Sequence, residues 1–348
     1  MAYTTINKGS SYFDTSLWTG TGATQSITSL NFQPDWLWVK TRSTAANHRS
    51  QNSVTGVTKG MNPNQTSAED TLTDCVTSFN SNGFTLGVDS QGYVNVSSRT
   101  YVGWSWLASN TTVANTSGTI SSTVSVNQTA GFSIVSYTGT GSVGNIGHGL
   151  GVAPKMIIKK KRSGADAWNV WHTSIGDGSK ALFLNLNNAI DTNANYASNV
   201  PTSSLFYVGT DSMINGSGAT YIAYCFAEIK GYSKFSSYVG NGSADGTFIY
   251  TGFKPAYVMV KASSTTGQWA ICDNKRGAAN ILNNNGEFLF AETNDATNSA
   301  PANWDFLSNG FKARANYAAH NSSGVTYIYM AFAENPFVSS TQIPTTAR

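Results

Sequence analysis

The stretch Pro34–Lys40, PDWLWVK, recurs in the chain as Pro154–Lys160, PKMIIKK, and as Pro255–Lys261, PAYVMVK. In each copy a proline opens a short apolar run, and a lysine follows six residues after the proline. Proline fits the first residue of a strand, where its missing N–H removes no bond from the sheet. An apolar run of this length indicates a buried strand. The recurrence therefore predicts the same strand in three related modules.

Two further patterns recur in the same order around this strand. One is an aromatic run near the end of each module, with offsets of three and five residues: Tyr101, Trp104 and Trp106; Tyr221, Tyr224 and Phe226; Tyr327, Met330 and Phe332. The other is an aromatic residue followed by alternating glycines: Trp18, Gly20 and Gly22; Tyr137, Gly139 and Gly141; Tyr238, Gly240 and Gly242. The aromatic runs predict core strands, and the glycines predict a tight turn or bulge.

These repeats predict an all-β chain of three tandem antiparallel β-sandwich modules, jelly-roll or concanavalin-like. The expected boundaries are residues 1–108, 109–230 and 231–348, the last with a short polar tail at its C-terminal end. Thr119–Val126 alternates enough to be the first strand of the second module. Helical patterns are weak, and the strongest candidate for a helical turn is Asp70–Ser78.

The composition limits the partners that the surface can bind. Charged residues make up 11% of the 348 residues, so Ser, Thr, Asn and Gly must build the surface, which suits neutral polar partners such as sugars. The net charge is +3, and no basic run exceeds Lys159–Arg162. A nucleic-acid binder needs a concentrated basic stripe. We therefore expect no nucleic acid, and we expect these lysines to lie in solvent at a strand end.

The cysteines and the apolar segments indicate in which cellular compartment the protein folds. Cys75, Cys225 and Cys272 are an odd number at irregular spacing, which is neither a disulfide framework nor a zinc site. Cys225 lies in an apolar strand pattern and is expected to be a buried thiol. No segment has the apolar length of a membrane span, and Met1–Ser10 lacks the regions of a signal peptide. We expect assembly in a reducing cytoplasm and no membrane insertion.

Catalytic motifs are not found in the sequence. The four histidines do not have metal-ligand spacing, and neither a nucleophile elbow nor a phosphate-binding loop occurs. Glycoside hydrolysis needs two carboxylates in one cleft. The position eighteen residues after each repeated proline is Asn52, His172 or Asp273, so the repeat carries no recurring acid. We expect no enzyme activity, no catalytic residue, no metal and no cofactor.

Aromatic side chains are the remaining candidates for binding. Trp168 and Trp269 both lie fourteen residues after their prolines, and this regular placement favours packing. Trp304 lies between Asn303 and Asp305 with no counterpart in the other copies, and it is expected in a loop that contacts a glycan or a protein partner. Trp18 and the turn residue His148 are the other two candidate contact residues.

The recurring patterns resemble a family of tandem modules in proteins of tailed bacteriophages, especially phages of marine bacteria. That family is a concanavalin-like β-sandwich domain of unknown function. The stretches that carry the resemblance span almost the whole chain: Met1–Lys8, Phe132–Gly141, His148–Ile158, Tyr221–Glu228 and Tyr327–Phe337. The resemblance implies a structural protein displayed on the virion surface, described variously as a tail-fibre or a head-surface protein. It supplies no catalytic residues.

Two functional hypotheses follow. The first is a non-enzymatic virion surface protein, either a capsid decoration protein or a compact tail-fibre adhesin, with weak binding to host glycans. Its partners would be other capsid or tail proteins, and it would be a homo-oligomer or bound to a lattice. Coiled-coil heptads of a fibre shaft are not found, and three modules in one chain can imitate a trimer over a three-fold lattice point. The alternative is a carbohydrate-active enzyme or a lectin that acts on host surface polysaccharide.

Overall fold

The computed structural model describes residues 4–277, 287–297 and 304–335. This part of the chain is built almost entirely from antiparallel strands. Its helical segments are the 3-10 turn η1 (Gly9–Ser11) and the short helix α1 (Ser212–Asn215). The prediction of an all-β chain is therefore confirmed. The helical turn expected at Asp70–Ser78 is wrong, because these residues contribute to strands β6 and β7.

The strands form three groups, each with a larger and a smaller sheet. The larger sheet of the first group has the order β1 (Phe13–Thr19), β9 (Thr100–Trp106), β3 (Trp36–Thr41), β4 (Arg49–Asn52), β5 (Lys59–Met61) and β6 (Asp70–Thr71). Its smaller sheet has the order β2 (Gln25–Ile27), β8 (Gly83–Leu86) and β7 (Val76–Asn80). The last long strand of the group thus lies between the first strand and the strand that follows the repeated proline.

The second group uses the same strand order after two additional strands at one edge. Its larger sheet runs β10 (Val113–Asn115), β11 (Ser122–Asn127), β12 (Phe132–Thr138), β19 (Thr220–Phe226), β14 (Met156–Lys161), β15 (Asn169–His172), β16 (Lys180–Phe183) and β17 (Asp191–Thr192). Its smaller sheet pairs β13 (Gly144–Gly147) with β18 (Leu205–Val208). The strand expected within Thr119–Val126 is present as β11, but β10 precedes it, so it is not the first strand of this sheet.

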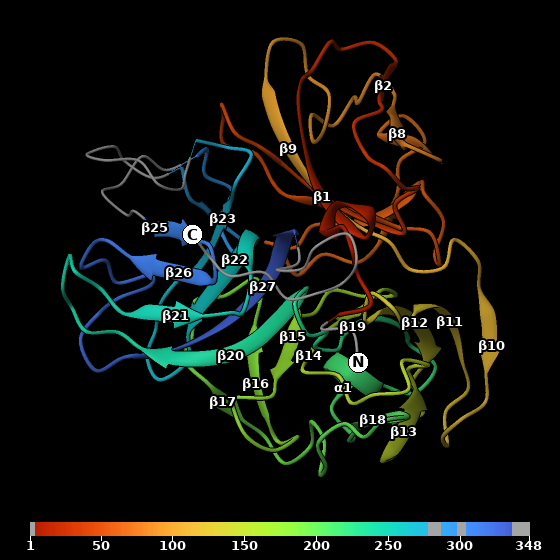
Figure 1. Cartoon of the computed structure of the whole chain (residues 1–348). Helices are drawn as coiled ribbons and strands as arrows, with labels where there is room; N and C mark the ends of the chain where they lie inside the picture. Colours follow the sequence, from red (N-terminus) through yellow and green to blue (C-terminus); the bar gives the residue numbers. More distant parts are fainter. Residues whose placement is uncertain (1–3, 278–286, 298–303, 336–348) are drawn as a thin grey trace.

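The third group repeats the order again. Its larger sheet runs β20 (Ser233–Val239), β27 (Thr326–Asn335), β22 (Lys254–Ala262), β23 (Trp269–Asp273) and β24 (Leu289–Phe290). Its smaller sheet runs β21 (Phe248–Tyr250), β26 (Gly310–Ala313) and β25 (Trp304–Leu307). Figure 1 shows the three groups around a common centre, with the first at the top, the second at the lower right and the third at the left. The module boundaries at residues 108 and 230 stay predictions, as does the count of three modules.

The centre is an aromatic core to which all three groups contribute. The strand after each repeated proline pairs with the last long strand of its group, so that Trp36 lies opposite Trp106 and Tyr257 lies opposite Phe332. Between groups, Trp36 stacks on Tyr224 with ring centroids 4.2 Å apart. Phe13 stacks on Phe332 at 5.0 Å. The three groups are therefore parts of one packed body.

The repeated lysines join neighbouring groups. Each donates from Nζ to a backbone carbonyl of another group: Lys40 to Asn294 (3.2 Å), Lys160 to Thr66 (3.2 Å) and Lys261 to Asn188 (2.8 Å). The first group thus binds the third, the second binds the first, and the third binds the second. Burial lowers the pKa of each of these three lysines to about 8. The expectation that the basic run Lys159–Arg162 lies in solvent is wrong, because Lys160 is fully buried in such a contact.

A second ring of contacts between groups lies at the position eighteen residues after each proline. The Asn52 amide donates to the Tyr224 hydroxyl (3.2 Å), the His172 imidazole donates to the Tyr329 carbonyl (3.2 Å), and the Asp273 carboxylate accepts from the Trp104 indole (3.0 Å). These bonds join the first group to the second, the second to the third, and the third to the first. Because buried polar groups are costly when they lack partners, both rings oppose separation of the groups.

A buried asparagine holds the glycine turn of each group. Its side-chain amide donates to two backbone carbonyls, as Asn215 does to Ser142 (2.6 Å) and Gly209 (2.7 Å). Asn95 and Asn321 make the corresponding pairs of bonds. Glycine is required beside it because a Cβ at Gly139 would approach the Gly216 carbonyl oxygen to 2.5 Å. The sequence pattern therefore marked the glycines of this turn but not the asparagine that fixes it.

Replacing Tyr224 with alanine is expected to lower the free energy of unfolding by about 3–5 kcal/mol, and Trp104→Ala should have a similar effect. Both side chains are completely buried in the shared core. Urea unfolding followed by circular dichroism measures the loss, and Val113→Ala is the control because Val113 is 57% exposed. A loss below about 1 kcal/mol for Tyr224→Ala would contradict its core position.

Candidate functional site

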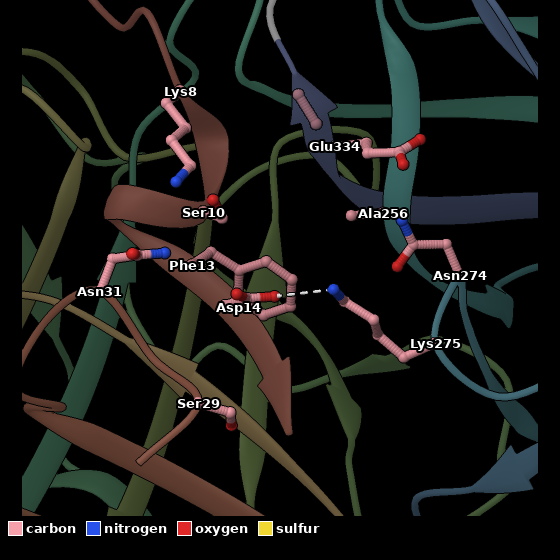
Figure 2. Close-up of a pocket in the computed structure, with 11 residues that line it drawn as sticks. Lys8, Ser10, Phe13, Asp14, Ser29, Asn31, Ala256, Asn274, Lys275 and Glu334 are labelled. Carbon is pink, nitrogen blue, oxygen red and sulfur yellow. Dashed lines mark ion pairs between the residues drawn. The ribbon is translucent and has the colours of Figure 1, made fainter. Parts of the chain in front are cut away.

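A polar cleft of about 380 Å³ lies between the N-terminal segment and the third group. One side comes from η1, the start of β1 and the loop after β2; the other comes from the ends of β23 and β27. Its lining includes Lys8, Asp14, Asn31, Lys275 and Glu334. Figure 2 shows Lys275 extending toward Asp14 from the opposite side of the cleft. Segments from the two ends of the chain thus form one site.

Asp14 is the most deeply placed charged side chain of this cleft. Its side chain is 15% exposed, and its carboxylate accepts a hydrogen bond from the Thr15 N–H at 2.8 Å. The Lys275 ammonium lies 3.9 Å from the same carboxylate. Burial raises the pKa of Asp14 above its usual value, while Thr15, Lys275 and Lys8 oppose this rise. The lysines therefore favour the ionised carboxylate that burial disfavours.

On the other wall of the cleft, Glu334 forms a second ion pair, whose lysine lies outside the cleft. The Glu334 carboxylate lies 2.7 Å from the Lys254 ammonium. Both residues also line an adjoining cavity of about 220 Å³, which shares Lys275 with the first. Each of the two carboxylates thus has a lysine as its counter-ion. This arrangement suits binding of a polar ligand through paired charges and amides.

The three predicted contact residues do not lie in this cleft, and all of them are buried. Trp304 lies in β25 with no exposed side-chain surface, packed against Phe288 and Phe311. The expectation that it lies in an exposed loop is wrong, because β25 alternates and places Trp304 on its inner side. Trp18 is 7% exposed, and its indole donates to the Val94 carbonyl at 2.9 Å.

His148 is buried as well. Its Nδ1 accepts from the Leu150 N–H at 3.2 Å, and its Nε2 donates to the Thr202 carbonyl at 3.1 Å. Both ring nitrogens are therefore occupied inside the protein, and burial lowers the pKa of the imidazole. His148 follows directly after β13, and its burial and internal bonds contradict the prediction of an exposed contact residue.

Sequence reasoning did not find the cleft because its residues lie at opposite ends of the chain. Glu334 lies two residues after Phe332, the last aromatic residue of the third repeat, and no local motif marks it as part of a site. Within residues 4–277, 287–297 and 304–335, no group of three His, Cys, Asp or Glu side chains could hold a metal ion. In the same described part, no helix is long and apolar enough to cross a membrane.

The fold and the cleft define an antiparallel all-β protein whose open site is polar. Its larger sheets share a central core, and the smaller sheets of the first and third groups pack on cores of their own. The chain belongs to the family described as Domain of unknown function (DUF7483), whose model matches residues 8–336. Comparison with curated proteins and with solved structures found no match.

Proposed function

We propose that this protein is a non-enzymatic structural protein on the surface of a tailed-phage particle, either a capsid decoration protein or a compact tail-fibre component. The observation that carries the proposal is the pair of contact rings between the sheet groups. Lys40, Lys160 and Lys261 close one ring, and the residues at Asn52, His172 and Asp273 close the other. Such closure gives a single chain the contact pattern of a cyclic trimer.

A body of this kind suits attachment to a symmetric lattice. A cyclic arrangement of three related faces can meet three equivalent partner surfaces at once, and simultaneous contacts raise the overall affinity without a new type of contact. The expected partners are other capsid or tail proteins, and the expected location is the virion. The low fraction of charged residues, 11%, also suits contacts with neutral polar surfaces.

The test is the composition and the map of intact particles. Phage particles purified by density gradient should contain the protein in a fixed ratio to the major capsid or tail protein, as measured by quantitative mass spectrometry. A cryo-electron microscopy map should show the three groups against neighbouring proteins. A protein that stays in the soluble fraction of the lysate and is missing from purified particles would overturn the proposal.

A second candidate is a carbohydrate-active enzyme, and one observation favours it. Asp14 and Glu334 both line the cleft, and burial raises the pKa of Asp14, as glycosidase chemistry requires of its acid. Incubation with host capsular polysaccharide, followed by size-exclusion chromatography, distinguishes the two. Under our proposal the chain length stays unchanged. A shortened polysaccharide would establish the enzyme instead, provided that Asp14→Asn abolishes the shortening and the control Asp177→Asn, at an exposed carboxylate outside the cleft, does not.

A further inference from the structure

The outer face of the smaller sheet of the third group carries two exposed aromatic side chains. In the edge strand β21, Phe248 is 44% exposed and Tyr250 is 61% exposed, whereas Ile249 between them is buried. Strand alternation therefore places both rings on the same side of the sheet, about 7 Å apart along the strand. Figure 1 shows β21 and β26 at the left, in the third group.

The neighbouring strand provides a flat floor for these rings. Tyr250 lies opposite Gly310 in β26, and Phe248 lies opposite Lys312. A Cβ at Gly310 would come within 3.0 Å of the Phe248 ring, so this ring lies over the glycine. Glycine is required at this position because a Cβ would collide with the Ile249 carbonyl oxygen, and its lack of a side chain leaves room for the Phe248 ring.

Charged side chains beside the rings neutralise one another. Lys312 lies 2.6 Å from Asp245, and Arg314 lies 3.6 Å from the same carboxylate. Arg314 also pairs with Asp305, which lies opposite Lys312 in β25. Two cations and two anions leave this face without net charge, and the exposed side chains of Asp245 and Arg314 can still bond to a ligand. A neutral ligand with many hydroxyl groups matches such a surface better than a charged one.

The other two groups do not have this aromatic pair. An isoleucine of the small sheet pairs with a phenylalanine in every group: Ile27 with Phe84, Ile146 with Phe206 and Ile249 with Phe311. The residue before that isoleucine is Ser26, Asn145 or Phe248. The recurring isoleucine–phenylalanine pair is part of the scaffold. An aromatic residue directly before the isoleucine is found only in the third of these three copies.

We propose that this face, formed by Phe248, Tyr250 and the charged groups around Lys312, binds a neutral polysaccharide. The two rings would stack on the apolar C–H faces of neighbouring sugar units, and the charged groups would bind their hydroxyls. The surface of two rings is far smaller than the roughly 800 Å² that a stable protein interface buries on each partner. A sugar chain therefore fits this face better than a protein partner does. The proposal goes beyond the proposed virion role and depends neither on that role nor on the cleft.

The experiment measures binding of the full chain to neutral glucans. Laminarin and dextran serve as neutral probes and alginate as an acidic one, with affinity from isothermal titration and contact from saturation-transfer NMR. We expect a neutral probe to bind, with about tenfold weaker affinity for Phe248→Ala and for Tyr250→Ala, and no measurable binding for the double variant. Tyr207→Ala, on the small sheet of the second group, is the matched aromatic control and should bind normally.

Three results would overturn the proposal. One is binding of neither neutral probe, together with no neutral glycan on an array. Another is neutral-glucan binding that the double variant retains, and the third is a concentration-dependent dimer that the double variant abolishes, since a second copy would then cover the face. Unchanged circular dichroism of the double variant separates lost binding from lost folding. Incorporation into particles is scored separately, so failure here leaves the virion proposal standing.

Discussion

Asp273→Ala is expected to lower the free energy of unfolding by about 4–6 kcal/mol. The Asp273 carboxylate is completely buried and accepts from the Arg276 guanidinium at 2.6 Å and from the Trp104 indole at 3.0 Å. It also accepts from the backbone N–H groups of Lys275 and Arg276. Its removal leaves a buried guanidinium without its counter-ion and an indole N–H without its acceptor. Guanidinium chloride unfolding followed by tryptophan fluorescence measures the loss.

Two control variants distinguish the effect of a buried ion pair from that of an exposed one. Asp245→Ala removes an ion pair with Lys312 in which the acid is 81% exposed, and it should leave the free energy of unfolding nearly unchanged. The double variant Asp273→Leu with Arg276→Met removes both charges and should recover part of the loss, because no isolated charge stays buried. An Asp273→Ala loss as small as that of Asp245→Ala would contradict the buried pair.

Asp273 also shows which features of the fold the sequence predicts and which it does not. The repeat placed Asn52, His172 and Asp273 at one position, and the structure places them in one ring of contacts. What the sequence could not provide was the partner of each, because every bond crosses to a different group, 157 to 172 residues away in the chain. Strand identity is local and follows from alternation and proline placement. Pairing between groups depends on how three sheets meet, which no local pattern encodes.

The failed site predictions have a similar cause. Trp304 was expected in a loop because Asn303 and Asp305 flank it, but a strand also alternates polar and apolar residues, and β25 turns Asp305 outward. Phe248 and Tyr250 carry the same period-two signal with the opposite outcome, exposed aromatics around a buried isoleucine. A period of two identifies the two faces of a strand, but it does not say which face meets the core.

Lowering the pH from 7.5 to 5 is expected to destabilise the protein strongly through its four histidines. Burial lowers the pKa of His172 to about 4 and that of His320 to about 3, and it lowers the pKa of His48 and His148 as well. The unfolded chain takes up these protons near pH 6.5, whereas the folded protein does not. The stabilisation is complete above pH 6.5 and is lost as the pH falls toward about 4.

The size of this effect follows from the individual groups. His172 and His320 alone should lower the free energy of unfolding by about 4 kcal/mol at pH 5. Glu292 acts in the opposite direction, because burial raises its pKa to about 7. Protonation of Glu292 should raise the free energy of unfolding by about 2 kcal/mol as the pH falls from 7.5 to 5. The loss from His172 and His320 alone exceeds this gain, so the free energy of unfolding falls overall.

Burial is the main reason why the folded protein does not take up these protons, and at His172 a bond to Nδ1 adds a second reason. The His172 Nδ1 accepts from the Ser174 N–H at 3.1 Å, and its Nε2 donates to the Tyr329 carbonyl. Protonation of Nδ1 would therefore leave the Ser174 N–H without its acceptor. His172→Asn, which introduces the residue of the equivalent position Asn52, should therefore reduce the loss between pH 7.5 and 5 by about 2 kcal/mol. Val113→Ala should leave the pH profile unchanged. Urea unfolding across this range measures both, and a free energy of unfolding that stays flat would show that the folded histidines take up protons normally.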